Sequence, residues 1–543
     1  GVSFTSNGGL GATSSFNLRG SSNNRTLILI DGVKYKDHSS ISGTDLAHIM
    51  ITDIERIEVI KGAQSGIWGA DAAAGVINII TKDEKDGTHG LVYSEYGSFY
   101  TFKYGGSIGY KNNKYDLKID AQKLSSEGFS VQSPKEEDLD QYEDDKYENT
   151  TINVKSNINV NDNGAIHLNV NKVDALKEYD SYNNPNDFTM KNDVNTKTYQ
   201  IAYTGKIKNH DYALKYESSD IKRDQIGTTF GVKETESKSS NLEFNDKVSY
   251  NQNDFVIAGF GKNKDKVNYT TPSNTKNDAK NDGKYIYATN SNTISKLIVT
   301  ESLRYDNYDN FDAKTTGKIG TKYSISSKLD IFANYGTAYS VPQLIQNINP
   351  WGASNMDLKP EKSKSYDIGV QFSDLKVTYF TQKVTDLIDW YDPDGYMGPI
   401  AAIYKNQDGE SKYKGIEVEY SKEILKSTLL TLNYSTLSEK DKDGKDLARR
   451  ANKTLKFALD YYGVENLHLG LNGEYVGERY NSADKQGEQT GKYTVVNCVA
   501  NYTVTKDIKT YIKVDNVTDK EYQSVDGYAT SPRAYYAGLK YNF

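Results

Sequence analysis

Apolar residues along this chain follow two patterns, one in about the first eighty residues and another in the rest. In the N-terminal part, nearly continuous apolar runs at residues 26–33, 54–60 and 76–80 end at turns. Short runs of this kind are typical of strands that are buried on both faces in a compact α/β unit. We therefore predict a small α/β domain over residues 1–83.

From about Gly90 the pattern changes to two-residue alternation in segments of roughly ten residues. Polar turns such as residues 112–113 and 162–164 separate the segments, and longer polar insertions such as residues 132–148 interrupt the series. Alternation with period two predicts strands that have one apolar and one polar face. The segments are residues 91–110, 114–124, 150–160, 165–173, 198–207, 212–218, 375–381, 429–435, 467–475 and 510–514.

Alternating strands can face either a soluble core or lipid, and the period alone does not separate the two. Short turns alternate with long acidic or Asn-rich loops, and almost no helical pattern interrupts the strands. The last strand places Tyr535, Leu539 and Phe543 on one face and ends on an aromatic residue. These features favour an all-β transmembrane barrel of about 22 antiparallel strands over residues 84–543, with the N-terminal domain in its lumen. A soluble β protein such as an adhesin stays open as an alternative.

The composition indicates that, if the chain crosses a membrane, it does so with β-strands and not with helices. Mean hydropathy is −0.72, and no apolar run approaches the roughly 20 residues that a membrane helix needs. The chain has 44 Tyr against 16 Phe and 3 Trp, and amphipathic rings of this kind gather where an apolar surface meets water. A net charge of −7 from mixed acids and bases, without a basic stripe, makes nucleic acid an unexpected partner.

The sequence contains few of the residue patterns that a catalytic site needs. The single cysteine, Cys498, excludes an internal disulfide, and the six His residues are scattered without metal-ligand spacing or a nucleophile motif. We therefore predict that the protein is not an enzyme and carries no catalytic cofactor; an outer-membrane enzyme with a catalytic pair in the barrel wall is the alternative. His38 is the histidine that could face a ligand, because it lies just before the Ser40–Ile41 pair considered below.

Several motifs occur in an order that resembles one family. The N-terminal set covers residues 17–20, 29–33, 57–62, 68–71 and 75–82, and a second set covers residues 335–342, 358–363, 414–419, 515–522 and the terminal Phe543. Together they resemble the TonB-dependent outer-membrane receptors, in which the N-terminal domain plugs the barrel. The resemblance implies a monomer in the bacterial outer membrane, surrounded by lipid and lipopolysaccharide and energised by TonB and its inner-membrane complex. It also implies that a signal peptide and a TonB-contacting segment precede Gly1.

Within this family the sequence most resembles the cobalamin (vitamin B12) transporters. The likeness lies in residues 1–9, 14–15, 384–389, 449–451, 477–480 and 527–528. It implies a corrinoid ligand in contact with plug loops at Ser15, Ser22, Ser40 and Ile41, and with Arg449 in the barrel. Ser22 and Ser40 replace other residue types, which keeps a ferric siderophore open as the alternative. A haem ligand is less expected, because residues 343–357 contain no His.

The same resemblance implies a calcium site in two of the long loops. Gln141, Glu143 and Asp145 resemble one arm of that site. Tyr179 and Asp180 resemble the other arm, with Asp187 or Asp193 as a closing ligand. Carboxylates packed together repel one another unless a hard cation lies among their oxygens. A solvated acidic loop is the alternative, and Ser130 stands where the resemblance leads us to expect a carboxylate.

Three plug cations are candidates for contacts with the barrel. Arg19, Arg56 and Lys61 are expected to face acidic residues of the barrel wall. A polar interface of this kind rearranges more easily than an apolar one, which would suit gating. Ordinary ion pairing without a part in gating is the alternative.

Overall fold

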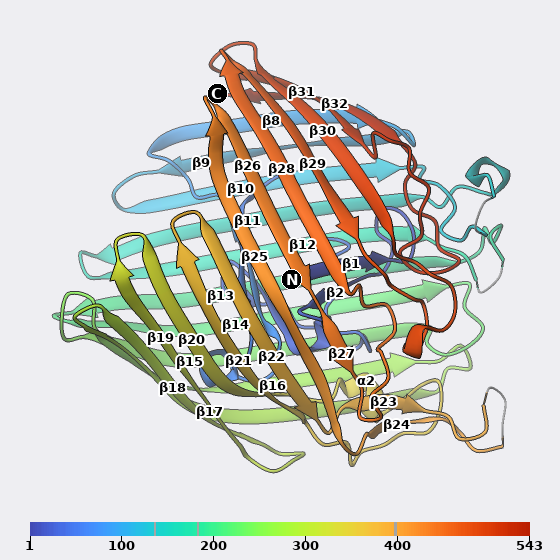
Figure 1. The fold of residues 1–543 in the computed structure, drawn as a ribbon, viewed down its shortest axis with the longest axis horizontal. Helices are drawn as coiled ribbons and strands as arrows, with labels where there is room; N and C mark the ends of the chain where they lie inside the picture. The colour runs from blue at the N-terminus through green and yellow to red at the C-terminus, as the bar shows by residue number, and fades with distance from the viewer. Residues whose placement is uncertain (135–136, 182–183, 396–398) are drawn as a thin grey trace.

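The computed structural model describes residues 1–543 except residues 135–136, 182–183 and 396–398. It consists of a large closed β-barrel and an N-terminal region that lies inside the barrel (Figure 1). Among the described residues, no helix is both long enough and apolar enough to cross a membrane.

The barrel is a closed antiparallel sheet of 22 strands, in which each strand pairs with its neighbour along the chain and β32 pairs with β8. The short β27 continues the line of β26, and both pair with β25. The strands are β8 (Gly87–Gly97), β9 (Thr101–Lys111), β10 (Tyr115–Ser126), β11 (Tyr147–Asn161), β12 (Gly164–Glu178), β13 (Lys191–Ile207), β14 (His210–Ile226), β15 (Glu234–Ser249), β16 (Phe255–Thr270), β17 (Lys276–Ile294), β18 (Leu297–Tyr308), β19 (Lys314–Ser326), β20 (Leu329–Ser340), β21 (Glu361–Phe372), β22 (Leu375–Thr385), β25 (Glu410–Leu425), β26 (Thr428–Thr436), β27 (Ser438–Lys440), β28 (Lys453–Val464), β29 (Leu467–Val476), β30 (Tyr493–Thr503), β31 (Ile508–Asp515) and β32 (Ala534–Asn542).

Side chains alternate between the lumen and the outside along these strands. Phe260 on β16 and Ile286 on β17 are opposite each other in the register, and they are 58% and 60% exposed. Asp265, on the other face of β16, is buried against the N-terminal region. Apolar side chains outside and polar side chains inside are the arrangement of a membrane barrel, so the strand alternation predicted from the sequence is confirmed.

The two ends of the barrel differ in the length of their connections. One end, the short-turn end, carries tight turns such as residues 162–163 and 465–466. The other, the long-loop end, carries residues 127–146, 341–360, 386–409, 477–492 and 516–533. Residues 341–360 contain helix α2 (Leu344–Asn347), and residues 386–409 contain the hairpin of β23 (Ile388–Tyr391) and β24 (Ile403–Asn406). The 3-10 turns η2 (Leu139–Gln141) and η3 (Ala483–Lys485) lie in two other long loops.

The enclosed plug region is built on two small sheets. In the four-stranded sheet, β4 (Thr26–Ile30) pairs in parallel with β7 (Gly75–Thr81), flanked by β5 (Val33–Lys34) and β6 (Ile54–Lys61). The second sheet has strands β1 (Val2–Ser6), β2 (Ser14–Leu18) and β3 (Ser21–Ser22). Its helical parts are the turn η1 (Asn23–Arg25) and the four-residue helix α1 (Ser65–Trp68). Gly75 has φ +154°, and a Cβ there would lie 2.2 Å from the Ile60 carbonyl oxygen, so the close pairing of β6 and β7 requires glycine.

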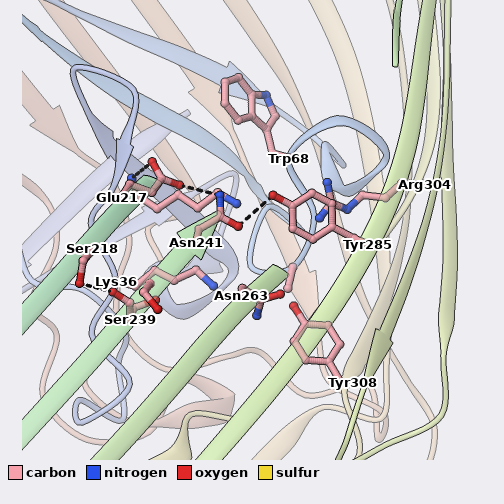
Figure 2. A pocket seen from close by; sticks show the side chains of 13 residues that line it. Lys36, Trp68, Glu217, Ser218, Ser239, Asn241, Asn263, Tyr285, Arg304 and Tyr308 are labelled. Atoms are coloured by element: carbon pink, nitrogen blue, oxygen red, sulfur yellow. Dashed lines mark hydrogen bonds between the residues drawn. The ribbon is translucent and has the colours of Figure 1, made fainter. Parts of the chain in front are cut away.

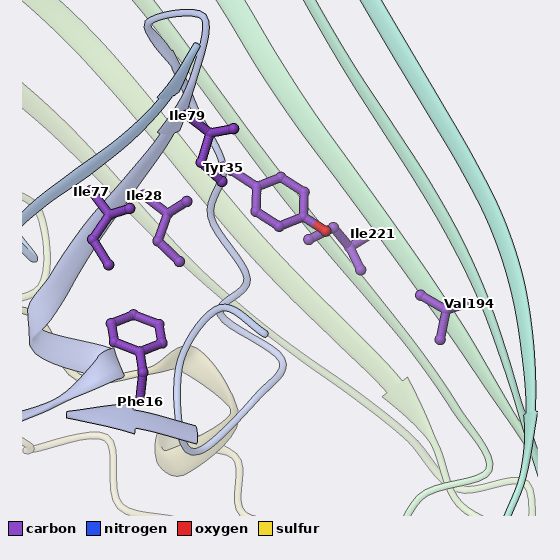
Figure 3. Packing of buried hydrophobic residues seen from close by; sticks show 7 residues of the cluster. All are labelled: Phe16, Ile28, Tyr35, Ile77, Ile79, Val194 and Ile221. Atoms are coloured by element: carbon purple, nitrogen blue, oxygen red, sulfur yellow. The ribbon is translucent and has the colours of Figure 1, made fainter. Parts of the chain in front are cut away.

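One apolar cluster joins the plug to the barrel wall (Figure 3). Its plug members are Phe16, Ile28, Tyr35, Ile77 and Ile79, and its barrel members are Val194 on β13 and Ile221 on β14. Burial of these side chains is the main apolar force that holds this side of the plug against the wall.

Two expectations from the sequence are wrong in detail. The run at residues 54–60 forms β6, but Ile57 is 55% exposed because β6 is the edge strand of the plug sheet and no layer covers it. Residues 91–110 form two strands rather than one, separated by a turn in which Phe99 and Tyr100 have positive φ. Residues on both sides of a tight turn keep the same alternation, so the pattern alone did not show the turn.

Candidate plug and ligand-binding site

Arg19 ties the plug to two barrel strands. Its Nη2 and Nε donate to Glu417 Oε2 at 2.9 and 3.2 Å, and its Nη1 donates to Asp367 Oδ1 at 2.6 Å. The guanidinium also lies 4.5 Å from the centre of the Phe380 ring. Burial disfavours the charged form, but the two carboxylates outweigh it and raise the pKa of Arg19. This plug cation is therefore charged and fixed at the wall.

Arg25 forms a second buried pair. Its Nη2 donates to Glu361 Oε1 at 2.9 Å, and its Nε donates to the other oxygen of the same carboxylate. The backbone N–H of Ile388 also donates to Glu361 Oε1 at 2.8 Å. A bidentate arginine–carboxylate pair fixes both distance and orientation, so Arg25 holds the plug in register with β21 and with the hairpin β23–β24.

The expected contact with acidic barrel residues is present for two of the three plug cations, Arg19 and Lys61. Lys61 lies 3.2 Å from Glu417 and 3.2 Å from Glu419, both on β25. The same prediction is wrong for Arg56, because its side chain is 52% exposed and pairs with Glu55 and Glu58 of the plug itself. The reason is the edge position of β6, whose outer residues face solvent within the lumen.

Elsewhere the plug and the wall enclose a small polar cavity of about 20 Å³, which is large enough for a water molecule (Figure 2). Asn241 Nδ2 donates to Glu217 Oε1 at 3.1 Å, and Tyr285 OH donates to Asn241 Oδ1 at 2.8 Å. Arg304 stacks 3.8 Å from the centre of the Tyr285 ring, and Lys36 of the plug completes the lining. On this side, therefore, the interface is polar and hydrogen-bonded rather than apolar.

At the long-loop end, the plug turn at Ser22 meets the loop between β27 and β28, residues 441–452. Arg450 Nη2 donates to Ser22 Oγ at 2.8 Å, and Arg450 Nε donates to the Gly20 carbonyl at 2.7 Å. The neighbouring Arg449 has positive φ, and its Nε donates to Asn481 Oδ1 at 2.9 Å. Burial lowers the pKa of Arg449. Ser22 and Arg449 are thus brought to the same end of the lumen, with Arg450 between the plug and the loop.

The other predicted ligand residues lie on two plug segments. Ser15 is half-buried on β2, and its carbonyl accepts a hydrogen bond from Thr5 Oγ1. Ser40 is half-buried, and its carbonyl accepts from the Gly43 N–H at 3.1 Å. Ile41 packs against two clusters of long-loop residues, one around Leu344, Ile345 and Ile348, the other around Leu358, Ile388 and Tyr404. The loops at residues 341–360 and 386–409 therefore cover the Ile41 position.

Three of the acidic residues predicted for the metal site lie together. Glu143, Asp145 and Asp180 offer carboxylate oxygens within 4.8 Å of one another. Asp145 is fully buried; its Oδ2 accepts from the Val131 N–H at 2.6 Å, while its Oδ1 has no hydrogen-bond partner among the residues that the structure describes. Within the same part of the chain, Glu143 Oε1 is also buried without a hydrogen-bond partner. Oxygen donors left unpaired inside a loop are the ligand type that Ca²⁺ prefers.

The pKa shifts of the acidic residues in this cluster also favour a bound cation. Burial, and then repulsion from Asp145 and Asp180, raises the pKa of Glu143 to about 8. Burial likewise raises the pKa of Asp145 and of Asp180. The charged forms of these groups are unfavourable without a cation. Ser130, which stands where a carboxylate was expected, donates from Oγ to Asp180 Oδ2 at 3.3 Å.

The remaining predicted ligands lie outside this group of three. Gln141 is exposed in η2, and Tyr179 is joined through its backbone N–H to the Met190 carbonyl. Asp187 accepts hydrogen bonds from the N–H and Oγ1 of Thr189. Asp193 is on β13, opposite Asp224.

Comparison with known families identifies both parts of the molecule. Residues 82–517 match the family described as "TonB dependent receptor-like, beta-barrel", and residues 1–76 match "TonB-dependent Receptor Plug Domain". The chain belongs to the TonB-dependent receptors. This family consists of outer-membrane transporters and receptors and is not an enzyme class.

Curated relatives of this receptor include vitamin B12 transporters. It is 27% identical to the vitamin B12 transporter BtuB of Vibrio vulnificus, with 100% of this chain and 88% of the relative covered. It is 28% identical to BtuB of Photobacterium profundum, with 99% and 87% covered.

Solved structures with a similar fold include siderophore receptors. The siderophore receptor PirA of Acinetobacter baumannii has a TM-score of 0.83 at 17% identity, with 100% of this chain and 94% of that chain covered. The ferric enterobactin receptor PfeA of Pseudomonas aeruginosa gives the same values. The copper transporter OprC has a TM-score of 0.81 at 16% identity, with 100% and 94% covered. At this identity the likeness shows the fold alone.

Sequence reasoning missed several residues that shape the receptor's site. Arg450 contacts the plug directly, and the adjacent Arg449–Arg450 pair was the available signal. The Ile345 N–H donates to the His38 carbonyl at 3.1 Å, which fixes α2 over the plug. No local sequence pattern predicts that contact.

His38 has a different environment from the one expected. It is 2% exposed; its Nδ1 lies 3.1 Å from Gln343 Oε1, and its Nε2 lies 3.5 Å from Asp265 Oδ2. The residue therefore faces the wall and the α2 loop, and a ligand would meet it only if that loop moved.

Proposed function

We propose that this receptor takes up a corrinoid across the bacterial outer membrane, with energy delivered through TonB and its inner-membrane partners. The observation that carries the proposal is full-length similarity to vitamin B12 transporters. It is supported by the arrangement of Ser22, Arg449 and Arg450 at the long-loop end. We place that end outside the cell, where it receives the ligand.

The binding chemistry follows from the lining residues. A large ligand with many amide groups needs a broad surface with several donors and acceptors and some apolar contact. Arg449 supplies donors, the serines supply both donors and acceptors, and Ile41 supplies apolar area. Because the loops at residues 341–360 and 386–409 cover Ile41, binding at Ile41 requires that these loops shift.

Release into the periplasm requires that the plug move, because it lies within the closed barrel. Ion pairs such as those of Arg19 and Arg25 contribute little compared with an apolar seal of the same area, but a charge left buried without its partner is costly. Movement of the plug must therefore bring water to both partners of each pair together. We propose that TonB acts by disturbing these contacts from the periplasmic side.

A ferric siderophore is the second candidate. The solved siderophore and enterobactin receptors share the fold, and the Tyr-rich chain and the Arg449–Arg450 pair offer the aromatic and basic groups that such ligands use. The two candidates differ in the ligand and not in the architecture, so a direct binding comparison separates them.

The deciding experiment is calorimetric titration of the purified receptor with cyanocobalamin and, separately, with ferric enterobactin. We expect cyanocobalamin to bind and Arg449→Ala to weaken it about tenfold, the loss of one charge-assisted hydrogen bond. Arg533→Ala, which removes an arginine paired with Asp519 in another long loop, is the matched control. Binding of the siderophore without cyanocobalamin would replace the corrinoid assignment.

We further propose that Ca²⁺ binds Glu143, Asp145 and Asp180 and orders the loops that carry them. The unpaired oxygens of Glu143 and Asp145 and the raised pKa values support this. Asp145 joins residues 127–146 to β12 as well, because Lys177 Nζ donates to its carbonyl at 3.0 Å. A cation here would therefore connect two long loops.

Calcium affinity should depend on pH, because the metal displaces protons. With the pKa of Glu143 raised to about 8 and that of Asp145 raised to about 7, protons compete with the metal at pH 6 and no longer compete above pH 8. Affinity should therefore rise by about tenfold per pH unit for each proton displaced. Isothermal titration with Ca²⁺ measures this. Asp145→Asn should abolish Ca²⁺ binding. Asp144→Asn is the control, because this neighbouring residue is exposed, and it should retain Ca²⁺ binding. Equal loss in both variants would show nonspecific charge effects instead of a site.

A further inference from the structure

One arginine of the barrel wall contacts the plug segment that carries Ser40 and Ile41. Arg223 of β14 lies with its Nη2 2.5 Å from Oδ2 of the buried Asp37, and its Nη1 donates to Ser39 Oγ at 3.0 Å. The other Asp37 oxygen, Oδ1, accepts from the Ser39 N–H at 3.0 Å and from the Ser39 hydroxyl at 2.6 Å. The guanidinium therefore fixes the backbone directly before Ser40.

The segment itself, residues 35–45, is an irregular part of the connection from β5 to β6. Thr44 Oγ1 donates to the Tyr35 carbonyl at 3.1 Å, and the Gly43 N–H donates to the Ser40 carbonyl at 3.1 Å. These local bonds close the segment on itself. Its place in the lumen depends on contacts with neighbouring elements, as for other irregular connections.

Residues 35–45 also touch the two other plug segments that carry predicted ligand residues. Asn23 Nδ2 donates to the Thr44 carbonyl at 3.2 Å. Ser14 Oγ donates to Asp45 Oδ1 at 2.8 Å. Asn23 and Ser14 each lie directly beside one of the predicted ligand serines in the chain. The position of residues 35–45 therefore affects the whole predicted contact surface of the plug.

Contacts from the barrel wall matter most when a ligand enters. The α2 loop holds the segment through the Ile345 N–H, which donates to the His38 carbonyl at 3.1 Å, and through apolar contact with Ile41. Binding at Ile41 requires this loop to shift, and the shift breaks both contacts. The contacts of Arg223 do not depend on the loop, and neither does the hydrogen bond from the His38 N–H to Ser237 Oγ on β15 at 3.0 Å.

We infer that Arg223 is a positioning residue for ligand binding, which keeps Ser40 and Ile41 in place while the covering loop opens. The buried Asp37 carboxylate is costly without a partner, so the ion pair strongly favours one position of the segment. A segment that is already ordered adds no ordering cost when the ligand binds. The inference deepens the proposed function and rests on it, because it takes Ser40 and Ile41 as ligand contacts.

Hydrogen–deuterium exchange tests the positioning without any ligand. Arg223→Gln should raise exchange of the Gly43 N–H about tenfold, because the segment loses its charged anchor. Lys118→Gln is the matched control: Lys118 is also a barrel cation paired with a plug carboxylate, that of Asp53, but it lies near the short-turn end. Unchanged exchange in Arg223→Gln, or an equal rise in the control, would overturn the inference whichever ligand the receptor binds.

Calorimetric titration with cyanocobalamin tests whether this position controls binding. Arg223→Gln should weaken binding about tenfold, because two side chains must then be ordered by the ligand, and Lys118→Gln should leave the affinity unchanged. The tenfold loss should vanish in the Ser40→Ala/Ile41→Ala background and persist in the Arg449→Ala background, because only coupled residues are non-additive.

Equal losses in both backgrounds would mean that Arg223 acts through general stability, and would overturn the inference. Failure of the unmodified receptor to bind cyanocobalamin would overturn the corrinoid assignment instead. The same variants would then be titrated with ferric enterobactin, and the exchange measurement would still decide whether Arg223 positions residues 35–45.

Discussion

Single plug side chains show how the receptor stays closed. Arg25 is completely buried among polar partners, and its guanidinium shares both carboxylate oxygens of Glu361. A buried pair of this kind contributes modestly relative to an apolar pair, but removing one partner is costly because the other charge stays buried.

Arg25→Met should therefore loosen the plug by about 3–5 kcal/mol. The double variant Arg25→Met/Glu361→Met should recover most of that loss, because no uncompensated charge remains. Urea denaturation of the plug, followed by protease sensitivity, measures both. Arg56→Met is the control, since that arginine is half exposed and pairs with Glu55 and Glu58 of the plug. Equal effects of Arg25→Met and Arg56→Met would contradict the structural role.

His38 makes plug stability depend on pH. Burial disfavours its charge, but Asp265 outweighs burial and raises the pKa of His38; Lys36, Asp71 and Gln343 also face it. A raised folded-state pKa gives a stabilisation that is complete below the unfolded value of about 6.5 and is lost as pH rises through the folded value.

His38→Gln should therefore lower the melting temperature at pH 6 more than at pH 9. His48→Gln is the matched control, because burial lowers the pKa of His48 to about 4 and keeps that ring neutral over the same range. Thermal melts of both variants at several pH values test the prediction. A difference that grows with pH would refute it.

At the scale of elements, a connection from the barrel closes the site. Helix α2 and its flanking residues are buried at the top of the plug, anchored by the Ile345 N–H to the His38 carbonyl and by the Tyr269 hydroxyl to the Ile348 carbonyl. A four-residue helix has little stability of its own, so its position depends on its apolar contacts with the barrel residues around Val267 and Tyr269 and with Ile41 of the plug.

Ile41→Ser should free α2 from the plug. Loss of the apolar contact removes about 1–2 kcal/mol, which should raise amide exchange of the Ile345 N–H about tenfold. Hydrogen–deuterium exchange measures this directly. Ile51→Ser is the control, because Ile51 is 70% exposed on the plug. Unchanged exchange at Ile345 would show that the hydrogen bonds and the barrel contacts hold the helix without Ile41.

At the scale of the whole molecule, plug and barrel differ in how they are held. Barrel strands are joined by continuous ladders around a closed sheet, whereas the plug is joined to the wall by several apolar clusters and separate polar contacts. A closed ladder has no edge from which to unravel, so the plug should unfold first.

Trp68 can report that order. It lies in the plug against Leu27, Leu29 and Val76, whereas the other two tryptophans, Trp351 and Trp390, lie in long loops. In the Trp351→Phe/Trp390→Phe variant, Trp68 fluorescence should change at a lower urea concentration than the far-ultraviolet signal of the barrel. Coincident transitions would mean that the two parts unfold as one unit.

The strands and the division into two parts were predictable from local sequence. Period-two alternation located strands such as β10, β11 and β29, because every lipid-facing position must be apolar whatever lies elsewhere. The edge exposure of β6 and the turn at residues 98–100 were not predictable, because they depend on which strands become neighbours.

For the site, the sequence alone predicted candidate residues, and the tertiary structure determined which of them lie close together. Residues 143, 145 and 180 were each visible as acids, yet only folding brings Asp180 from the loop after β12 to Glu143 and Asp145. Likewise Arg450 reaches Ser22 across 428 positions of sequence. The sequence by itself determined the strands, because alternation is a property of each strand. The contacts between plug and barrel belong to the tertiary structure, because they join residues that lie more than 300 positions apart in the chain.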